Sequence, residues 1–299
     1  MTRVLTVLAT AAVALALTTG VGARQAGQRT VYVTALTGKS VPVTDLAASD
    51  FVIKEDGKAR EIVRAERATA PMHIALMLDN GGVALNAIRQ GSGEFIAALQ
   101  GKAEFAIITI GGRALTLVEF TGNVPALYAG LGKLLARSTT STDLLDGFLE
   151  LSAEFQRRKA ERPVIVAIAT EGEEMSNTRA PVVLEALQKS GTRLYYIGLG
   201  PPVTQGSRPP LAANRPDSGS DAETANRNAV LGTGPKNSGG RSEQVLQDTG
   251  LVPLMKQFAD ELLNQYAVTY ATDAPQAKLS VETKRKGVTL RAPARVGGR

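Results

Sequence analysis

Two short segments of this chain are almost wholly apolar, and each ends on a polar residue. HIALML, at residues 73–78, is followed by Asp79, and VIVAIA, at residues 164–169, is followed by Thr170 and Glu171. A strand that is apolar on both faces must be covered on both sides, as the inner strands of a parallel sheet are. The pattern therefore predicts an α/β fold with helices on both faces of the sheet.

The sequence around these two runs alternates between strand and helix patterns. Apolar residues recur at helical spacing between the strand patterns, and Gly111-Gly112 separates two strands that follow one another directly. We therefore predict a doubly wound, largely parallel, Rossmann-like sheet over residues 70–200. Its other expected elements are strands at 105–110, 114–120 and 194–199 and helices near 85–99, 124–135, 144–155 and 181–189.

The N-terminus has the pattern of an export signal. Arg3 precedes an apolar run over residues 4–17, and Val21-Gly22-Ala23 supplies small residues at the two positions that a signal peptidase reads. The run is shorter than the roughly 20 residues of a membrane-spanning helix. We predict a signal peptide at residues 1–23, a secreted or periplasmic mature chain, and no transmembrane segment after cleavage.

Strand patterns flank the α/β region on both sides. Residues 30–34 alternate at period two, and Asp56-Gly57 separates two strand patterns as in a two-residue hairpin. Strand patterns return near the C-terminus, after a helix stripe that begins at Leu251. We expect the two flanks, residues 28–68 and residues 241–292, to form a small β-rich accessory unit.

Two segments show no such pattern. Residues 201–240 are dominated by Pro, Gly, Ser, Asn and Asp, and such a composition buries too little apolar surface to offset the entropy of ordering. We predict a disordered insertion there. Residues 293–299 are predicted to be a frayed, basic tail.

The residue types exclude several kinds of chemistry. The chain has no Cys and a single His, His73, so disulfides, thiolate nucleophiles and Cys- or His-cluster metal sites are absent. There is no Gly-x-Ser-x-Gly motif, and His73 lies at the start of a predicted buried strand, so a serine hydrolase is not indicated. We find no catalytic constellation and predict that the chain is not an enzyme.

The strand that ends in Asp79, Thr142 further along, and Thr170-Glu171-Gly172-Glu173 together resemble a von Willebrand factor A domain. The flanks are similar to those of the secreted "VWFA-related" proteins of Acidobacteria. They are LAASDFVIKEDGKAREI at residues 46–62, DELLNQYAVTYAT at residues 260–272 and KRKGVTLRAP at residues 284–293. The resemblance implies a von Willebrand A-like core and an adhesion-type function.

The resemblance also implies a metal-ion-dependent adhesion site, which this sequence matches poorly. The family pattern has Asp-x-Ser-x-Ser on the first loop, a Thr on the second and an Asp on the third. Asp79 and Thr142 match, but Gly81 and Val83 replace the two Ser residues, and Glu171 replaces the third-loop Asp. Since Mg²⁺ requires six oxygen ligands in near-octahedral order, we expect no bridging Mg²⁺ and no other cofactor. Asp79, Thr142 and Glu171 are then vestigial metal positions.

Our hypothesis is that a protein partner, whose identity the sequence does not give, binds the rim formed by Asp79, Asn80, Gly81, Thr142 and Glu171. Asp79 and Thr142 are expected to hold the loops by hydrogen bonds to backbone. The alternative is a weak Mg²⁺-dependent phosphohydrolase that uses Asp79, although Gly81 stands where such enzymes have their general acid.

The C-terminal segment is basic, within a chain of net charge +6. We expect either a solvated edge strand protected by cations or a contact with an envelope polyanion, and no nucleic-acid binding. The basic residues are Lys278, Lys284, Arg285, Lys286, Arg291, Arg295 and Arg299, against Glu282.

Overall fold

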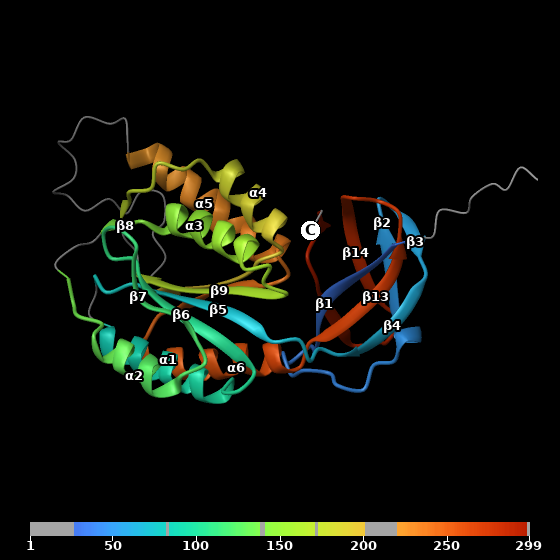
Figure 1. Cartoon of the computed structure of the whole chain (residues 1–299), viewed down its shortest axis with the longest axis horizontal. Coiled ribbons are helices and arrows are strands. Elements are labelled where there is room, and N and C mark those ends of the chain that lie inside the picture. Colours follow the sequence, from blue (N-terminus) through green and yellow to red (C-terminus); the bar gives the residue numbers. More distant parts are fainter. Residues whose placement is uncertain (1–26, 82–83, 138–140, 171–172, 201–219, 298–299) are drawn as a thin grey trace, which may run out of the picture.

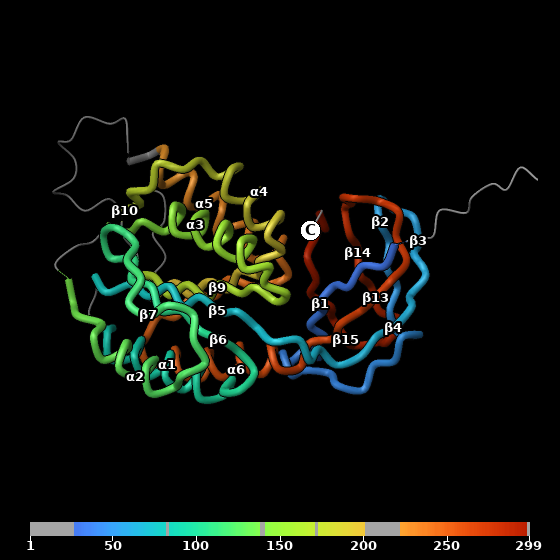
Figure 2. Tube along the Cα trace, viewed as in Figure 1, coloured from blue at the N-terminus to red at the C-terminus, as the bar shows by residue number. Residues whose placement is uncertain are grey.

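The computed structural model describes residues 27–81, 84–137, 141–170, 173–200 and 220–297. Figure 1 shows two units side by side, a sheet covered by helices on both faces and a smaller unit made of strands. The N- and C-terminal segments of the chain meet in the smaller unit, as the blue and red parts of the trace in Figure 2 show.

The six-stranded central sheet has the order β12-β11-β9-β5-β6-β7. All neighbouring strands are parallel except β6 and β7, which form an antiparallel pair around the Gly111-Gly112 turn. This confirms the predicted largely parallel sheet. The strands are β5 (Met72–Leu78), β6 (Ala103–Thr109), β7 (Leu115–Thr121), β9 (Arg162–Thr170), β11 (Arg193–Leu199) and β12 (Arg241–Val245).

Three helices cover each face of this sheet, and each face has its own apolar core. Alternate residues of β5 point into different cores, with Leu76 in one and Met77 in the other, so the run at residues 73–78 is apolar because both sides are buried. On one face lie α1 (Leu85–Ala98), α2 (Val124–Gly132) and α6 (Leu251–Leu263); on the other lie α3 (Leu144–Arg157), α4 (Ala180–Ser190) and α5 (Ser220–Asn237).

The accessory unit contains two four-stranded sheets, of order β15-β1-β13-β4 and β16-β14-β2-β3. Strands from the two ends of the chain pair directly, since β1 is antiparallel to β13 and β2 to β14. The unit encloses a third apolar core around Tyr266 and Tyr270. Its strands are β1 (Gly27–Thr37), β2 (Phe51–Glu55), β3 (Lys58–Arg60), β4 (Ile62–Arg67), β13 (Tyr266–Thr272), β14 (Ala277–Thr283), β15 (Val288–Arg291) and β16 (Arg295–Val296).

The predicted hairpin at Asp56-Gly57 joins β2 to β3. Both residues have positive φ, 47° for Asp56 and 81° for Gly57. These values suit the tight turn whose backbone twist matches that of paired strands.

Two predictions for the C-terminal third are wrong. Part of the segment predicted as a disordered insertion, residues 201–240, is helical, because residues 220–237 form α5; residues 201–219 lie outside the described part. In the tail at residues 293–299, which we expected to be frayed, β16 pairs with β14. In both cases contacts with distant elements order a segment whose own composition does not.

Candidate functional site

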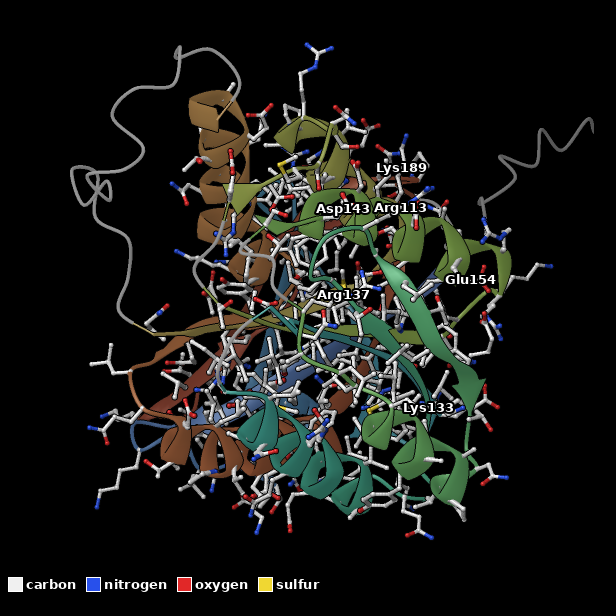
Figure 3. All side chains as sticks on the ribbon, turned by 90° about the vertical axis from the view of Figure 1, so that its left-hand side faces the viewer. Arg113, Lys133, Arg137, Asp143, Glu154 and Lys189 are labelled. Carbon is white, nitrogen blue, oxygen red and sulfur yellow. The ribbon has the colours of Figure 1, made fainter. Side chains whose placement is uncertain are left out.

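Several loops meet at the edge of the sheet where β5, β6 and β9 end, and we call this edge the rim. Backbone hydrogen bonds join the loops: Arg137 N donates to Asn80 O at 2.8 Å, and Gly112 N donates to Ser141 O at 2.9 Å. Figure 3 looks onto this edge, with Arg113, Arg137 and Asp143 labelled on it. The rim comprises residues 79–81, 110–115, 135–137, 141–143 and 173–176, together with Leu246 after β12.

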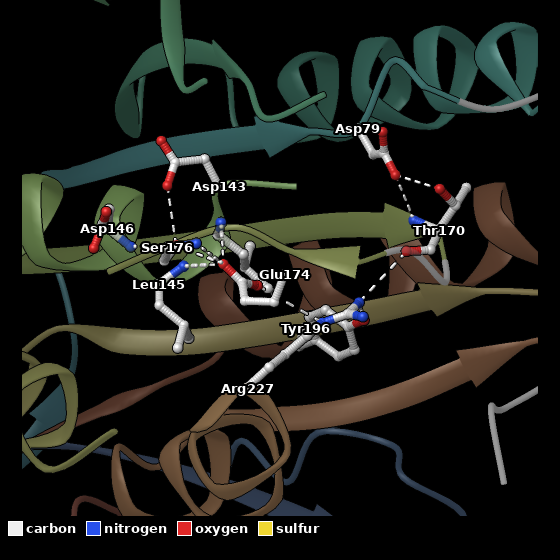
Figure 4. A network of polar contacts seen from close by, with 10 residues as sticks. Asp79, Asp143, Leu145, Asp146, Thr170, Glu174, Ser176, Tyr196 and Arg227 are labelled. Carbon is white, nitrogen blue, oxygen red and sulfur yellow. Dashed lines mark hydrogen bonds and ion pairs between the residues drawn. The ribbon is translucent and has the colours of Figure 1, made fainter. Parts of the chain in front are cut away.

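Asp79 follows β5 and is only 2% exposed. Its Oδ1 accepts a hydrogen bond from Gly81 N at 2.7 Å. Its Oδ2 accepts from Thr170 N at 2.8 Å and from the Thr170 hydroxyl, as the dashed lines in Figure 4 show. Both oxygens are thus engaged inside the protein, and the carboxylate links the ends of β5 and β9. The expectation that Asp79 bonds loop backbone is met by these contacts.

Asn80 and Gly81 form the first rim loop. The Asn80 amide donates to Leu135 O at 2.8 Å, so the side chain holds the segment after α2 rather than pointing into solvent. A Cβ atom added at Gly111 would lie only 2.4 Å from the Asn80 Oδ1. Position 111 therefore has to be glycine for the first loop to pack against the end of β6. Gly81 supplies only its backbone amide, to Asp79.

Thr142 lies in the two-residue strand β8 (Ser141–Thr142), which pairs with β10 (Glu173–Glu174). Its carbonyl accepts from Met175 N at 2.8 Å. Its side chain is buried, and Oγ1 has no hydrogen-bond partner among the described residues. Thr142 thus bonds loop backbone through its main chain, whereas its side chain does not. Glu171 lies outside the described residues.

Glu174 is a structural anchor that sequence reasoning missed. Its Oε1 accepts from Leu144 N at 3.1 Å and Leu145 N at 3.4 Å, so this carboxylate caps the first turn of α3 from a distant loop. Ser176 donates to the same oxygen from its backbone and its hydroxyl. Glu174 is therefore buried and engaged inside the protein, whereas its neighbour Glu173 is exposed.

Arg227 of α5 lies beside Glu174, with its Nε 4.0 Å from the Glu174 Oε2. It also donates to Tyr196 Oη at 3.1 Å and to Thr170 O at 3.4 Å, so it connects the Glu174 and Asp79 halves of the network in Figure 4. Burial raises the pKa of Glu174 above its usual value. The hydrogen bonds from Ser176 and Leu145 and the charge of Arg227 oppose this shift. Since Arg227 lies in a polar helix, no local sequence signal pointed to this pairing.

A bridging divalent cation does not fit the described donors. Both Asp79 oxygens already accept internal hydrogen bonds, and Gly81 brings no side-chain oxygen. Thr142 Oγ1 is the one rim hydroxyl of the family pattern that remains without a partner in the described part of the chain. Within that part no group of three His, Cys, Asp or Glu side chains is placed to hold a metal. The side chains that the structure describes at the rim therefore supply too few oxygens for a six-oxygen shell.

The rim is rich in exposed apolar side chains. Four large apolar residues on the rim have exposed fractions between 49% and 68%. Most other apolar residues nearby are buried in the two cores. The four exposed residues are spread along the rim, since β7 and β12 are the two edge strands of the central sheet, and Arg113 and Arg137 lie on the same rim (Figure 3). The four residues are Leu115, Leu135, Met175 and Leu246.

The basic C-terminal segment does not present a single cationic face. Arg285 pairs with Asp45 at 2.6 Å, and Arg291 pairs with the buried Glu261 at 2.9 Å. Lys278 and Arg295 instead line a cleft between the two units. None of the described helices has the length and apolar character needed to cross a membrane.

No protein-family model and no curated protein matches this sequence. Solved structures do match. A von Willebrand factor type A structure from Catenulispora acidiphila has a TM-score of 0.47 at 10% identity, over 92% of this chain and 75% of that one. Proximal thread matrix protein 1 from the mussel byssus, with zinc occupied MIDAS motif, has a TM-score of 0.50 at 11% identity, over 68% of this chain and 49% of that one.

The pilus adhesin SpaC from Lactobacillus rhamnosus GG has a TM-score of 0.48 at 10% identity, over 83% of this chain and 42% of that one. This chain therefore spans about half the length of the byssus protein (49%) and less of the adhesin. Together with the strand order of the central sheet, the match to the byssus protein gives the chain a von Willebrand factor A-like fold. At such low identity the likeness concerns the fold alone.

Proposed function

We propose that this chain is an exported, non-catalytic protein-binding module that binds its partner through the rim without a bridging cation. One observation carries the proposal: both oxygens of Asp79 accept hydrogen bonds from Gly81 and Thr170. With three hydrogen bonds accepted, this carboxylate stabilises the loops and keeps at most about one of its four lone pairs for an ion. Export rests on the signal-peptide pattern of residues 1–23.

The exposed apolar side chains support the rim as the binding surface. Leu135 and Met175 are 68% and 57% exposed, and both are held by backbone contacts to rim loops, through Asn80 and Thr142 respectively. An apolar surface on a fixed backbone loses little conformational entropy on binding, so its burial contributes to affinity. Arg113 and Arg137 would border the contact as polar groups.

The Asp79 geometry gives no support to phosphoester hydrolysis. A nucleophilic carboxylate needs a free oxygen directed at the substrate, and a general acid is needed beside it. Here the oxygens accept from Thr170 and Gly81, and position 81 has no side chain.

The proposal can be tested by selecting displayed random peptides on the immobilised full chain, in parallel with EDTA and with Mg²⁺. We expect selected peptides to bind equally in both buffers. Their binding should be lost in Leu135→Glu and in Met175→Glu. Val63→Glu is the matched control, because Val63 is also an exposed apolar residue but lies on β4 of the accessory unit. Glu171→Ala should change binding little.

Two results would refute the proposal. Binding that requires Mg²⁺ and disappears with EDTA would show that a cation bridges the contact. Peptides that bind Leu135→Glu and Met175→Glu as well as they bind the unmodified chain would show that the rim is not the binding surface. Circular dichroism of each variant separates a lost contact from a lost fold.

A further inference from the structure

A cleft of about 1350 Å³ lies between the two units, at the opposite end of the central sheet from the rim. One wall is β1, and the other is formed by α4 and by the first residues of β9 and β11. Residues 293–297 also line it, and in Figure 1 they lie beside the letter C, between α4 and β1. Nothing in the rim proposal uses this cleft.

The β1 wall of the cleft is an open strand edge. β1 pairs with β13 along residues 27–33, but on its other side it pairs with β15 only from Thr34 to Thr37. In an antiparallel strand the backbone groups of alternate residues point to the same side. Tyr32 O accepts from Arg193 on the side away from β13, so the N–H and C=O of Gln28 and Thr30 point to that side too. Neither residue has a strand partner there among the described residues.

The cleft is also cationic. Arg162, Arg193, Lys278 and Arg295 line it, and none of the four has a carboxylate within ion-pair distance in the part of the chain that the structure describes. Two further cations of the lining are neutralised, Arg29 by Glu55 at 2.7 Å and Lys189 by Glu185 at 2.6 Å. The acids of the lining are Glu161, Glu185 and Asp273, three against six cations, so the lining carries a net positive charge.

Two of the unbalanced cations form the floor of the cleft and cannot swing away. Arg162 donates to Ala70 O at 2.8 Å, to Leu262 O and to Gln265 Oε1, and Arg193 donates to Tyr32 O and Gly239 O. Both are 5% exposed. Burial lowers the pKa of Arg162 to about 10, which leaves it charged at neutral pH. Glu161 near Arg162 and Glu261 near Arg193 offset part of this charge, and the fixed positive charge that remains attracts anions where water is partly excluded.

We propose that this cleft binds an extended acidic peptide, which adds as a strand along the edge of β1 at Gln28 and Thr30 while its carboxylates face the cationic lining. Main-chain hydrogen bonds give such strand addition its affinity, and side-chain charges give its specificity. The Arg193 guanidinium on Tyr32 O marks where the added strand ends. A peptide is favoured over an anionic polysaccharide because the open groups of β1 have the spacing of a strand ladder.

The test uses a short fluorescent peptide of alternating glutamate and threonine with the full chain. Fluorescence anisotropy should show binding, and a lysine–threonine peptide should not bind. Two N-methylated forms of the acidic peptide are compared, one methylated at the odd-numbered residues and the other at the even-numbered residues. Both keep the charge, and each lacks the main-chain donors of one edge. We expect one of the two sets to weaken binding about tenfold, since only one edge of the peptide faces β1.

The protein variants test the charges. Lys278→Glu combined with Arg295→Glu should weaken peptide binding at least about tenfold, because both exposed side chains line the cleft. Lys286→Glu is the matched control, since Lys286 is exposed near the same end of the chain but outside the cleft lining. Hydrogen exchange measured by NMR should slow at the Gln28 and Thr30 amides when the peptide is bound.

Three outcomes would overturn the proposal. In the first, the acidic peptide does not bind. In the second, both N-methylated peptides bind as well as the parent peptide and oligogalacturonate competes equally, and this result would identify a site for polyanions in general. In the third, Lys286→Glu weakens binding as much as the double variant. Since the rim variants Leu135→Glu and Met175→Glu leave the cleft intact, failure here and failure of the rim proposal are separate results.

Discussion

Asp79 and Thr170 are joined by two hydrogen bonds, from the backbone amide of Thr170 at 2.8 Å and from its hydroxyl, both to Oδ2 of the carboxylate. They stand at the ends of neighbouring strands, 91 positions apart in the chain. The contact holds the loop after β5 against the end of β9. It makes the Asp79 carboxylate part of the framework of the fold.

Asp79→Ala should destabilise the protein by about 2 kcal/mol, because three partly buried donors lose their acceptor. Urea unfolding of the full chain measures this. Asp260→Ala, at an exposed position on α6, is the control and should stay within about 0.5 kcal/mol of the unmodified protein. An equal effect of the two substitutions would mean that Asp79 is not a structural link.

Divalent cations should have no effect on this protein. Calorimetric titration with Mg²⁺ or Mn²⁺ is expected to give no binding heat, and EDTA should leave the unfolding temperature unchanged, because the described rim donors are too few for a six-oxygen shell. No Mg²⁺-dependent turnover of a generic phosphoester is expected either. Turnover that disappears in Asp79→Asn would support the hydrolase alternative instead.

Glu174→Ala should cost about 2 to 3 kcal/mol of stability, since the first turn of α3 loses the acceptor for Leu144 N and Leu145 N. Glu173→Ala is the matched control: Glu173 is its neighbour on β10 but is exposed. Thermal and urea unfolding of both variants would decide the point. Similar losses in the two variants would contradict the capping role.

Glu174 should also make stability depend on pH. Burial raises its pKa in the folded protein above the 4.5 of an unperturbed glutamate, so around and above pH 4.5 the folded state binds more protons than the unfolded state. This group's contribution is therefore fully present below pH 4.5 and decreases as the pH rises through the folded pKa. The difference in unfolding free energy between the unmodified chain and Glu174→Gln should fall over that range. A flat or rising difference would contradict the shift.

Gly111→Ala should be strongly destabilising, because the new Cβ would stand 2.4 Å from Asn80 Oδ1 and 3.2 Å from Gly81 N. Gly132→Ala is the control, since nothing lies within 4 Å of its Cβ position in α2. This second change should stabilise the helix by up to about 1 kcal/mol. If Gly111→Ala unfolds at the same urea concentration as the unmodified protein, the close packing of the first loop on β6 is wrong.

Export predicts a defined mature N-terminus. When the chain is produced in a bacterium with an active secretion system, it should appear outside the cytoplasm with Arg24 as its first residue, by N-terminal sequencing. Ala23→Arg should block this processing. A cytoplasmic product that starts at Met1 would remove the export part of the proposal.

The strands of the central sheet and the hairpin turn could be predicted because their signals are local. The run at residues 73–78 is apolar on both faces since each face of β5 meets a separate core, and Asp56-Gly57 adopts positive φ angles that few other residue pairs favour. α5 could not be predicted in the same way. Its residues are polar, and Pro235 lies inside it, so it is ordered through contacts such as those of Arg227 with Glu174 and Tyr196.

The sequence by itself determined which strands are buried on both faces and where the chain turns. These properties depend on residue types at fixed spacing. Only the tertiary structure decided that the Asp79 oxygens are taken up by Thr170 and Gly81, that Glu174 caps α3, and that β1 offers an open edge to a cationic cleft. A hydrogen bond or a charge imbalance depends on which distant groups the fold brings within a few ångströms, and spacing along the chain does not contain that information.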